Sequence, residues 1–63
     1  MRNLEYNIRL KDWIARQSSP RYARYQVRDI LGCSPQSVYL WEHQKRKMSS
    51  SDFRLLQLHI KDL

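Results

Sequence analysis

Apolar and polar residues alternate along the first part of the chain, from residue 4 to residue 11. A period of two is typical of a half-buried β-strand, so the pattern predicts a strand over residues 3–9. A helix fits this stretch less well, because Leu4 and Ile8 would point away from its apolar face. A first helix is expected only afterwards, from about residue 10 to residue 17.

Two helical segments with polar caps follow. Ser19 and Ser34 each precede a proline, and a serine N-cap followed by proline at the first helical position is a common helix start. We therefore expect helices over residues 20–31 and 35–44. Gly32, the only glycine of the chain, lies between them, and glycine is favoured where a helix ends in a left-handed residue. The pattern predicts a helix-turn-helix, a motif whose second helix enters the DNA major groove.

The last stretch, residues 53–63, is compatible with two structures. As a strand, residues 56–61 alternate cleanly and would pair with the first strand. As a helix, the stretch has one apolar stripe and leaves Leu55 and Leu58 on its far side, free for a dimer contact. We expect the strand, which gives an α+β fold: a three-helix helix-turn-helix core with a small antiparallel sheet from the two chain ends. An all-α, four-helix domain with a C-terminal helix is the alternative.

Charge indicates the class of partner. Twelve Lys and Arg residues face six Asp and Glu residues, which leaves a net charge of +6 on 63 residues. Such a balance favours polyanions, above all nucleic acid. Basic residues flank both predicted helices of the helix-turn-helix, which spans about residues 20–44 of a single domain, 1–63. The expected partner is double-stranded DNA.

Other classes of function find no support in the composition. One cysteine allows no internal disulfide and no zinc site of the usual Cys and His count. The acidic residues, histidines and cysteine show no spacing typical of catalysis, so no enzyme activity, metal, cofactor or small-molecule ligand is expected. No apolar run reaches the roughly 20 residues of a membrane span, so no membrane partner is expected. A domain this small has a limited core, and a homodimer is expected.

One stretch resembles a known family. Residues 30–42, ILGCSPQSVYLWE, resemble the helix-turn-helix of Cro and C1-type phage repressors, whose pattern is roughly L-G-(small apolar)-S-x-x-(S/T)-(V/I)-x-x-W-E. The residues that match it are Leu31, Gly32, Ser34, Ser37, Val38, Trp41 and Glu42. Residues 8–13, IRLKDW, are similar to the strand-into-helix opening of lambdoid Cro proteins. The resemblance implies a transcriptional repressor that binds a palindromic operator as a homodimer, in the cytoplasm of a bacterial or phage-infected host cell.

The chain departs from that family at two positions. Arg28 stands where the family usually has an alanine packed against the recognition helix, and Gln44 replaces a common glycine. Excisionases and MerR-type regulators carry a similar G-x-S-P run, so an excisionase-like architectural DNA-binding factor is an alternative function. A basic protein-interaction module that captures an acidic partner is another.

The outward side of the second helix of the motif carries the predicted DNA-reading residues. Side chains near the start of a recognition helix reach base edges, and glutamine can bond bidentately to adenine. The predicted base contacts are Gln36, Ser37, Tyr39, Leu40 and His43. Phosphate contacts supply affinity and register, and those predicted are Arg21, Arg24, Lys45, Arg46 and Lys47.

Three further expectations concern the interior. Trp13 and Trp41 are expected to meet in the core beneath the helix-turn-helix. Cys33 is expected to pack as a small hydrophobe. Glu42 lies at the edge of the inner face. It is expected either to pair with an arginine of the first or second helix, with Arg28 or Arg16 as candidates, or to remain exposed.

Overall fold

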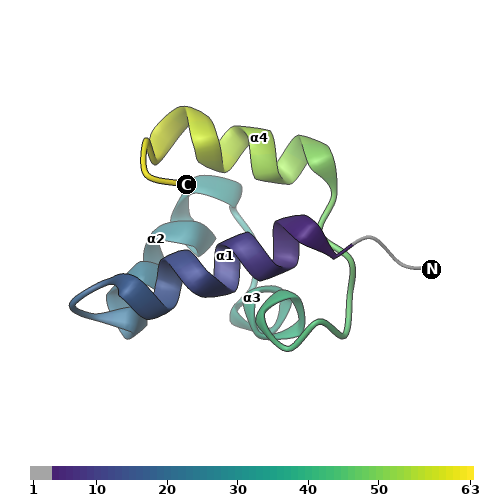
Figure 1. Ribbon diagram of the computed structural model, residues 1–63, viewed down its shortest axis with the longest axis horizontal. Helices are drawn as coiled ribbons and strands as arrows, with labels where there is room; N and C mark the ends of the chain where they lie inside the picture. The colour runs from purple at the N-terminus through teal and green to yellow at the C-terminus, as the bar shows by residue number, and fades with distance from the viewer. Residues whose placement is uncertain (1–3) are drawn as a thin grey trace.

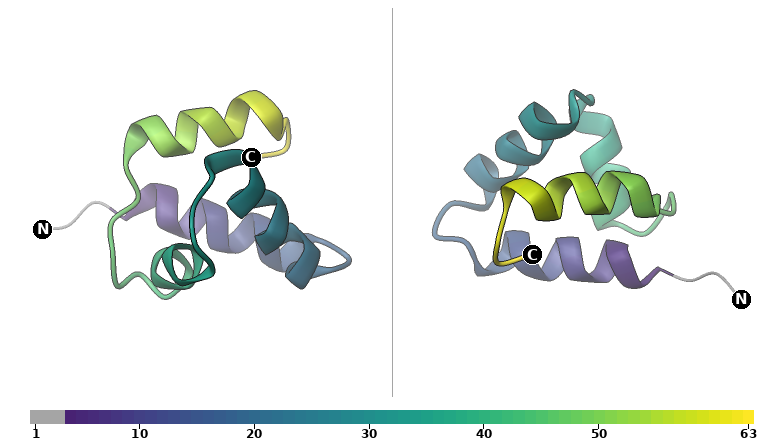
Figure 2. Two further views of the ribbon diagram at one scale, coloured as in Figure 1. Left: turned by 180° about the vertical axis from the view of Figure 1, so that it is seen from behind. Right: turned by 90° about the horizontal axis from the view of Figure 1, so that it is seen from above.

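The computed structural model describes residues 4–63 and contains four helices (Figure 1). These are α1 (Glu5–Arg16), α2 (Pro20–Leu31), α3 (Pro35–Glu42) and α4 (Ser50–His59). Helix α1 packs against α2 and α3, and α2 packs against α3 and α4. Helices α1 and α4 run in the same general direction in the views of Figures 1 and 2, whereas α3 lies across them and is seen nearly end-on in Figure 1.

The expected α+β fold was wrong, because the described residues form no strand. The four-helix alternative is the observed architecture. Within residues 4–63, no helix combines the length and the apolar character needed to cross a membrane.

Helix α1 occupies the stretch for which a strand was predicted. It begins at Glu5, well before the expected start at residue 10, and residue 3 of the expected strand lies outside the described residues. The buried side of α1 consists of Asn7, Leu10, Trp13 and Ile14. Asn7 therefore completes a helical stripe, while Ile8, which suggested the alternation, is 53% exposed. A buried polar residue and an exposed apolar one together produced the false strand pattern.

Helix α4 replaces the second predicted strand. The Ser49 hydroxyl accepts a hydrogen bond from the Asp52 amide at 3.2 Å and caps its start. Phe53 and Leu56 are buried, whereas Leu58 is 80% exposed. The alternation over residues 56–61 therefore predicted a strand wrongly, because it placed the exposed Leu58 on the same face as the buried Leu56.

The central pair of helices was better predicted. Helix α2 covers the expected range, with the Ser19 hydroxyl accepting a hydrogen bond from the Tyr22 amide at 3.3 Å. Helix α3 ends two residues earlier than expected, at Glu42, because the backbone of Gln44 turns left-handed with φ 58°.

One hydrophobic cluster joins all four helices. Trp13 and Trp41 both belong to it, as expected of core tryptophans. Ring stacking in the described part of the chain instead joins Tyr6 of α1 to Phe53 of α4, with centroids 4.6 Å apart. Members of the cluster from outside the helices are Met48 and Leu63. The core thus ties α4 to the side of the bundle away from α3.

Candidate nucleic-acid interface

Helices α2 and α3 are joined by a three-residue turn, 32–34. Gly32 has φ 64°, a left-handed conformation in which glycine bears no Cβ penalty. The Cys33 amide donates to the Arg28 carbonyl at 3.2 Å, which satisfies a carbonyl at the end of α2. The Ser34 hydroxyl accepts from the Ser37 amide at 3.4 Å and caps α3. The arrangement of α2, turn and α3 is that of a helix-turn-helix.

The residues predicted to read bases differ in their exposure. Gln36, Tyr39 and His43 are exposed, whereas Ser37 and Leu40 are half-buried. The Ser37 hydroxyl lies 3.3 Å from the Ser34 hydroxyl, so it already takes part in the cap. The rings of Tyr39 and His43 are in contact, with centroids 4.2 Å apart and planes inclined by 41°. The exposed side of α3 is therefore a polar surface with an aromatic patch.

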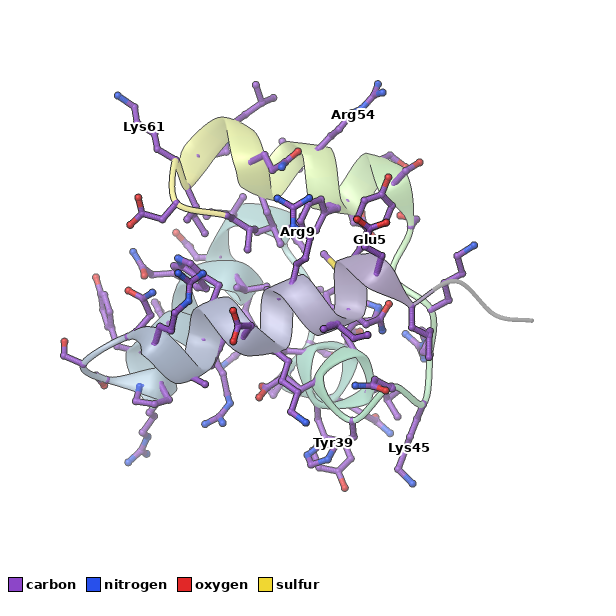
Figure 3. All side chains as sticks on the ribbon, in the orientation of Figure 1. Glu5, Arg9, Tyr39, Lys45, Arg54 and Lys61 are labelled. Carbon is purple, nitrogen blue, oxygen red and sulfur yellow. The ribbon has the colours of Figure 1, made fainter. Side chains whose placement is uncertain are left out.

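A basic loop follows α3 directly. Lys45, Arg46 and Lys47 are all exposed. The Lys45 amide donates to the Leu40 carbonyl at 2.8 Å, which folds the loop back against the end of α3. Figure 3 shows Tyr39 and Lys45 on the same side of the molecule, opposite Arg54 of α4 and Lys61, which follows α4. The basic loop and the exposed residues of α3 thus face the same way.

A buried asparagine fixes this loop. Asn7 is fully buried, and its Nδ2 donates to the Trp41 carbonyl at 3.1 Å and to the Arg46 carbonyl at 2.6 Å. Its Oδ1 accepts from the Met48 amide at 2.9 Å. One side chain of α1 therefore holds the backbone on both sides of Lys47. Sequence reasoning missed Asn7, and the only signal was its position in a helical stripe with Leu10.

An ion pair connects α2 to α3. Arg24 Nε lies 2.7 Å from Glu42 Oε1, and Arg24 Nη2 lies 3.3 Å from Oε2. The hydrogen bond that Arg24 donates to Glu42 raises the pKa of Arg24, although burial acts in the opposite direction. Glu42 pairs with an arginine of the second helix, as expected, but both named candidates were wrong: Arg16 pairs with Asp12 of its own helix at 3.5 Å, and Arg28 pairs with no carboxylate within residues 4–63. Arg24 and Arg28 are one turn apart, and Arg24 is the one that reaches the carboxylate.

This pairing changes the part that Arg24 can play. It was predicted to contact phosphate, yet its guanidinium is already held by a carboxylate that is 12% exposed. An arginine in a bidentate carboxylate contact would have to give it up, or share its donors, to bind a phosphate. The other four predicted phosphate contacts, Arg21 and the three residues of the loop, are exposed. We keep those four as predictions and assign Arg24 to holding α2 and α3 together.

A cleft of about 360 Å³ opens between α2 and α3. Its α2 wall is formed by Arg21, Arg24, Tyr25 and Arg28. Its α3 wall is formed by Pro35, Val38, Tyr39, Glu42 and His43. Four of the predicted DNA contacts are thus brought together around one hollow, namely Arg21, Arg24, Tyr39 and His43, whereas Gln36 lies outside it.

Arg28 has an unusual environment within this cleft. Its Nε is buried and donates no hydrogen bond to any of the described residues. Its guanidinium carbon lies 5.7 Å from the centroid of the Tyr25 ring. The side chain is half-buried at the contact between the two helices. The sequence marked Arg28 as the residue that departs most from the motif, and the structure places it at the edge of a hollow.

The remaining chemistry of the chain is sparse. Cys33 is half-buried, and burial raises the pKa of its thiol, with a further contribution in the same direction from Asp52. No group of three or more His, Cys, Asp or Glu side chains within residues 4–63 is placed to hold a metal ion.

Comparison of the chain with protein-family models, with curated proteins and with solved structures finds no match.

Proposed function

We propose that this protein binds double-stranded DNA through its helix-turn-helix, with α3 in the major groove. The observation that carries the proposal is the exposed side of α3, held by a glycine turn and a serine cap and continued by the exposed loop Lys45–Lys47. A recognition helix needs polar side chains near its start and cations that reach the flanking phosphates. A net charge of +6 supplies the field that attracts the polyanion.

In this proposal the residues divide into two groups. Gln36 reads a base edge from the first turn of α3, with Tyr39 and His43 adding contacts further along. Ser37 and Leu40 contribute less, because both are half-buried. Arg21 and the loop Lys45–Lys47 contact phosphates on either side of the groove.

The regulatory role depends on how two copies associate. The expected Cro-like fold included a small sheet from the two chain ends, and the described residues contain no strand. This favours the excisionase-like role, an architectural factor that binds adjacent sites and bends DNA without a strong dimer. A repressor that binds a palindromic operator as a homodimer is the second candidate, supported by the exposed Leu55 and Leu58 of α4. Sedimentation of the free protein and the symmetry of its footprint separate the two roles.

Selection of bound duplexes from a random pool tests the proposal directly. We expect enrichment of a defined sequence whose symmetry and spacing report the role. The affinity should fall with salt at a slope of roughly −0.9 per phosphate neutralised, or about −4 for four cations. Binding without sequence preference together with a flat salt dependence would contradict the proposal and favour a protein-interaction module.

Three single substitutions distinguish base contacts from phosphate contacts. Gln36→Ala should cost about 1–3 kcal/mol on the selected site and relax the preference at one base pair. Lys45→Ala should weaken all sequences alike and reduce the salt slope by about 1. Lys61→Ala is the control, because Lys61 carries the same charge on the opposite side of the molecule (Figure 3). Equal losses for Lys45→Ala and Lys61→Ala would mean that binding reflects net charge alone.

A further inference from the structure

The cleft between α2 and α3 has the composition of a small-ligand site. Its volume of about 360 Å³ lies at the lower end of the roughly 300–1,000 Å³ that ligand pockets occupy. Three arginines and one glutamate line it, and Glu42 is already paired with Arg24. Two guanidinium groups, those of Arg21 and Arg28, are therefore left without a carboxylate partner within the described residues. The hollow attracts anions.

The two unpaired arginines lie on the same wall. They are seven residues apart on α2, which is two helical turns or about 10 Å along the axis. Tyr25 lies between them and also lines the cleft. The buried Nε of Arg28 has no acceptor among residues 4–63. A buried donor without a partner gains most from an acceptor that enters the site, and a phosphate oxygen is such an acceptor.

The opposite wall is aromatic. Tyr39 and His43 form a contacting pair on α3, and Tyr39 is 52% exposed. An exposed ring is a surface on which a nucleobase can stack, and stacking tolerates any base because every base has a π face. A cleft with cations on one wall and rings on the other matches a ligand that joins a phosphate to an aromatic base.

We propose that this cleft binds one nucleoside phosphate, with its phosphate on Arg28 and its base against Tyr39. The inference goes beyond the proposed duplex binding, since a groove-bound α3 needs neither Arg28 nor an unstacked base. The ligand is either a free nucleotide or an unpaired nucleotide of a strand, because both present the same chemistry.

Calorimetric titration of the full chain tests the site. The probes are adenosine monophosphate, inorganic phosphate and adenosine, which separate the whole ligand from its two parts. We expect adenosine monophosphate to bind about tenfold or more tighter than either part, because the charged contact and the stacked base act together. A nucleotide that binds no tighter than inorganic phosphate would overturn the proposal.

Variants locate the binding. Arg28→Ala and Tyr39→Leu should each weaken the nucleotide about tenfold. Arg54→Ala should leave the affinity unchanged, because Arg54 is an exposed arginine of α4 on the far side of the molecule (Figure 3). Arg28→Lys keeps the charge and should restore part of the affinity if Arg28→Ala proves poorly folded by circular dichroism. Equal losses in Arg28→Ala and Arg54→Ala would refute the site.

The source of the nucleotide is distinguished in the same experiment. A four-nucleotide adenine single strand that binds more tightly than the mononucleotide, with the same loss in Arg28→Ala, identifies an unpaired strand as the ligand. Equal affinity for the strand and for the mononucleotide identifies a free nucleotide as the ligand. Both results support the proposed site. Duplex binding is measured separately through Gln36→Ala. If the unaltered protein binds duplex DNA but not the nucleotide, this inference is rejected and the proposed function stands.

Discussion

Removal of the Asn7 side chain should destabilise the protein more than any other single deletion of a polar group. Its amide bridges α1 to the last turn of α3 and to the segment that follows α3 through three hydrogen bonds of 2.6 to 3.1 Å. All three partners are backbone groups, which cannot turn away to find other partners. The side chain is fully buried, so water does not readily replace it.

The cost follows from the groups left behind in Asn7→Ala. The Met48 amide and the Arg46 carbonyl lose the partner that Asn7 supplies, whereas the Trp41 carbonyl keeps the Gln44 amide at 3.1 Å. A buried backbone group left unsatisfied costs about 1–3 kcal/mol, so the buried Met48 amide and the smaller contribution of the part-buried Arg46 carbonyl together cost about 3 kcal/mol. In a domain of this size, that free energy lowers the melting temperature by roughly 12–24 °C.

Thermal unfolding followed by circular dichroism and by tryptophan fluorescence measures the effect. Gln17→Ala is the matched control, since it removes an amide that donates one local hydrogen bond, to the Trp13 carbonyl at 2.9 Å. The control should lose about 1 kcal/mol or less. Asn7→Asp should destabilise the protein at neutral pH at least as much as Asn7→Ala, because its buried carboxylate keeps the Met48 amide but faces the Trp41 and Arg46 carbonyl oxygens without a donor. If Asn7→Ala melts within a few degrees of Gln17→Ala, the claim that this residue pins the basic loop is refuted.

Four further predictions concern the turns, the ion pair and the cysteine. Gln44→Gly should stabilise the protein by about 0.5–1 kcal/mol in urea unfolding, because Gln44 has φ 58°. Gly32→Ala should destabilise it by about 1 kcal/mol, although open space surrounds a Cβ at that position; no loss would mean that the turn has changed conformation. A double-mutant cycle on Arg24 and Glu42 should give a coupling of about 1 kcal/mol, and zero coupling would remove the pair from the account of how α2 holds α3. Cys33 should react with iodoacetamide more slowly than a free cysteine at neutral pH, since burial raises its pKa and less thiolate is present. The alkylation rate of the folded protein should rise at a higher pH than that of the unfolded chain. Over the same pH range the folded state should lose stability, because the thiol of the unfolded chain releases its proton at a lower pH.

The helix-turn-helix was predictable because local signals fix its boundaries. Ser19 and Ser34, each before a proline, mark the starts of α2 and α3, and Gly32 marks the end of α2. Such caps act within one turn of the chain, so sequence alone carries the information. The end of α3 was missed because the left-handed residue is Gln44 rather than glycine.

The two ends of the chain failed for a reason that lies in the tertiary structure. Hydrophobic periodicity assumes that buried residues are apolar, and Asn7 breaks this assumption. Its burial is favourable only because α3 and the segment after it present three backbone groups to Asn7, and no local pattern contains those residues. At the other end of the chain the periodicity treated Leu58 as buried because it is apolar, whereas it is exposed in the structure. Both errors concern residues whose environment is set by distant parts of the chain.

The same reasoning explains why the site was only half predicted. Spacing on α3 identifies which residues point outward, so the exposure of Gln36 and His43 followed from the sequence. Spacing on α2 does not decide which of two arginines one turn apart meets Glu42, because that depends on where α3 crosses α2. In the structure Arg24 takes the carboxylate, and Arg28 is left at the helix contact with a buried donor and no acceptor. An arginine that has no carboxylate partner and lies beside a cleft indicates a ligand, whereas an arginine already paired with a carboxylate does not. For this reason the nucleotide proposal rests on Arg28 rather than on Arg24.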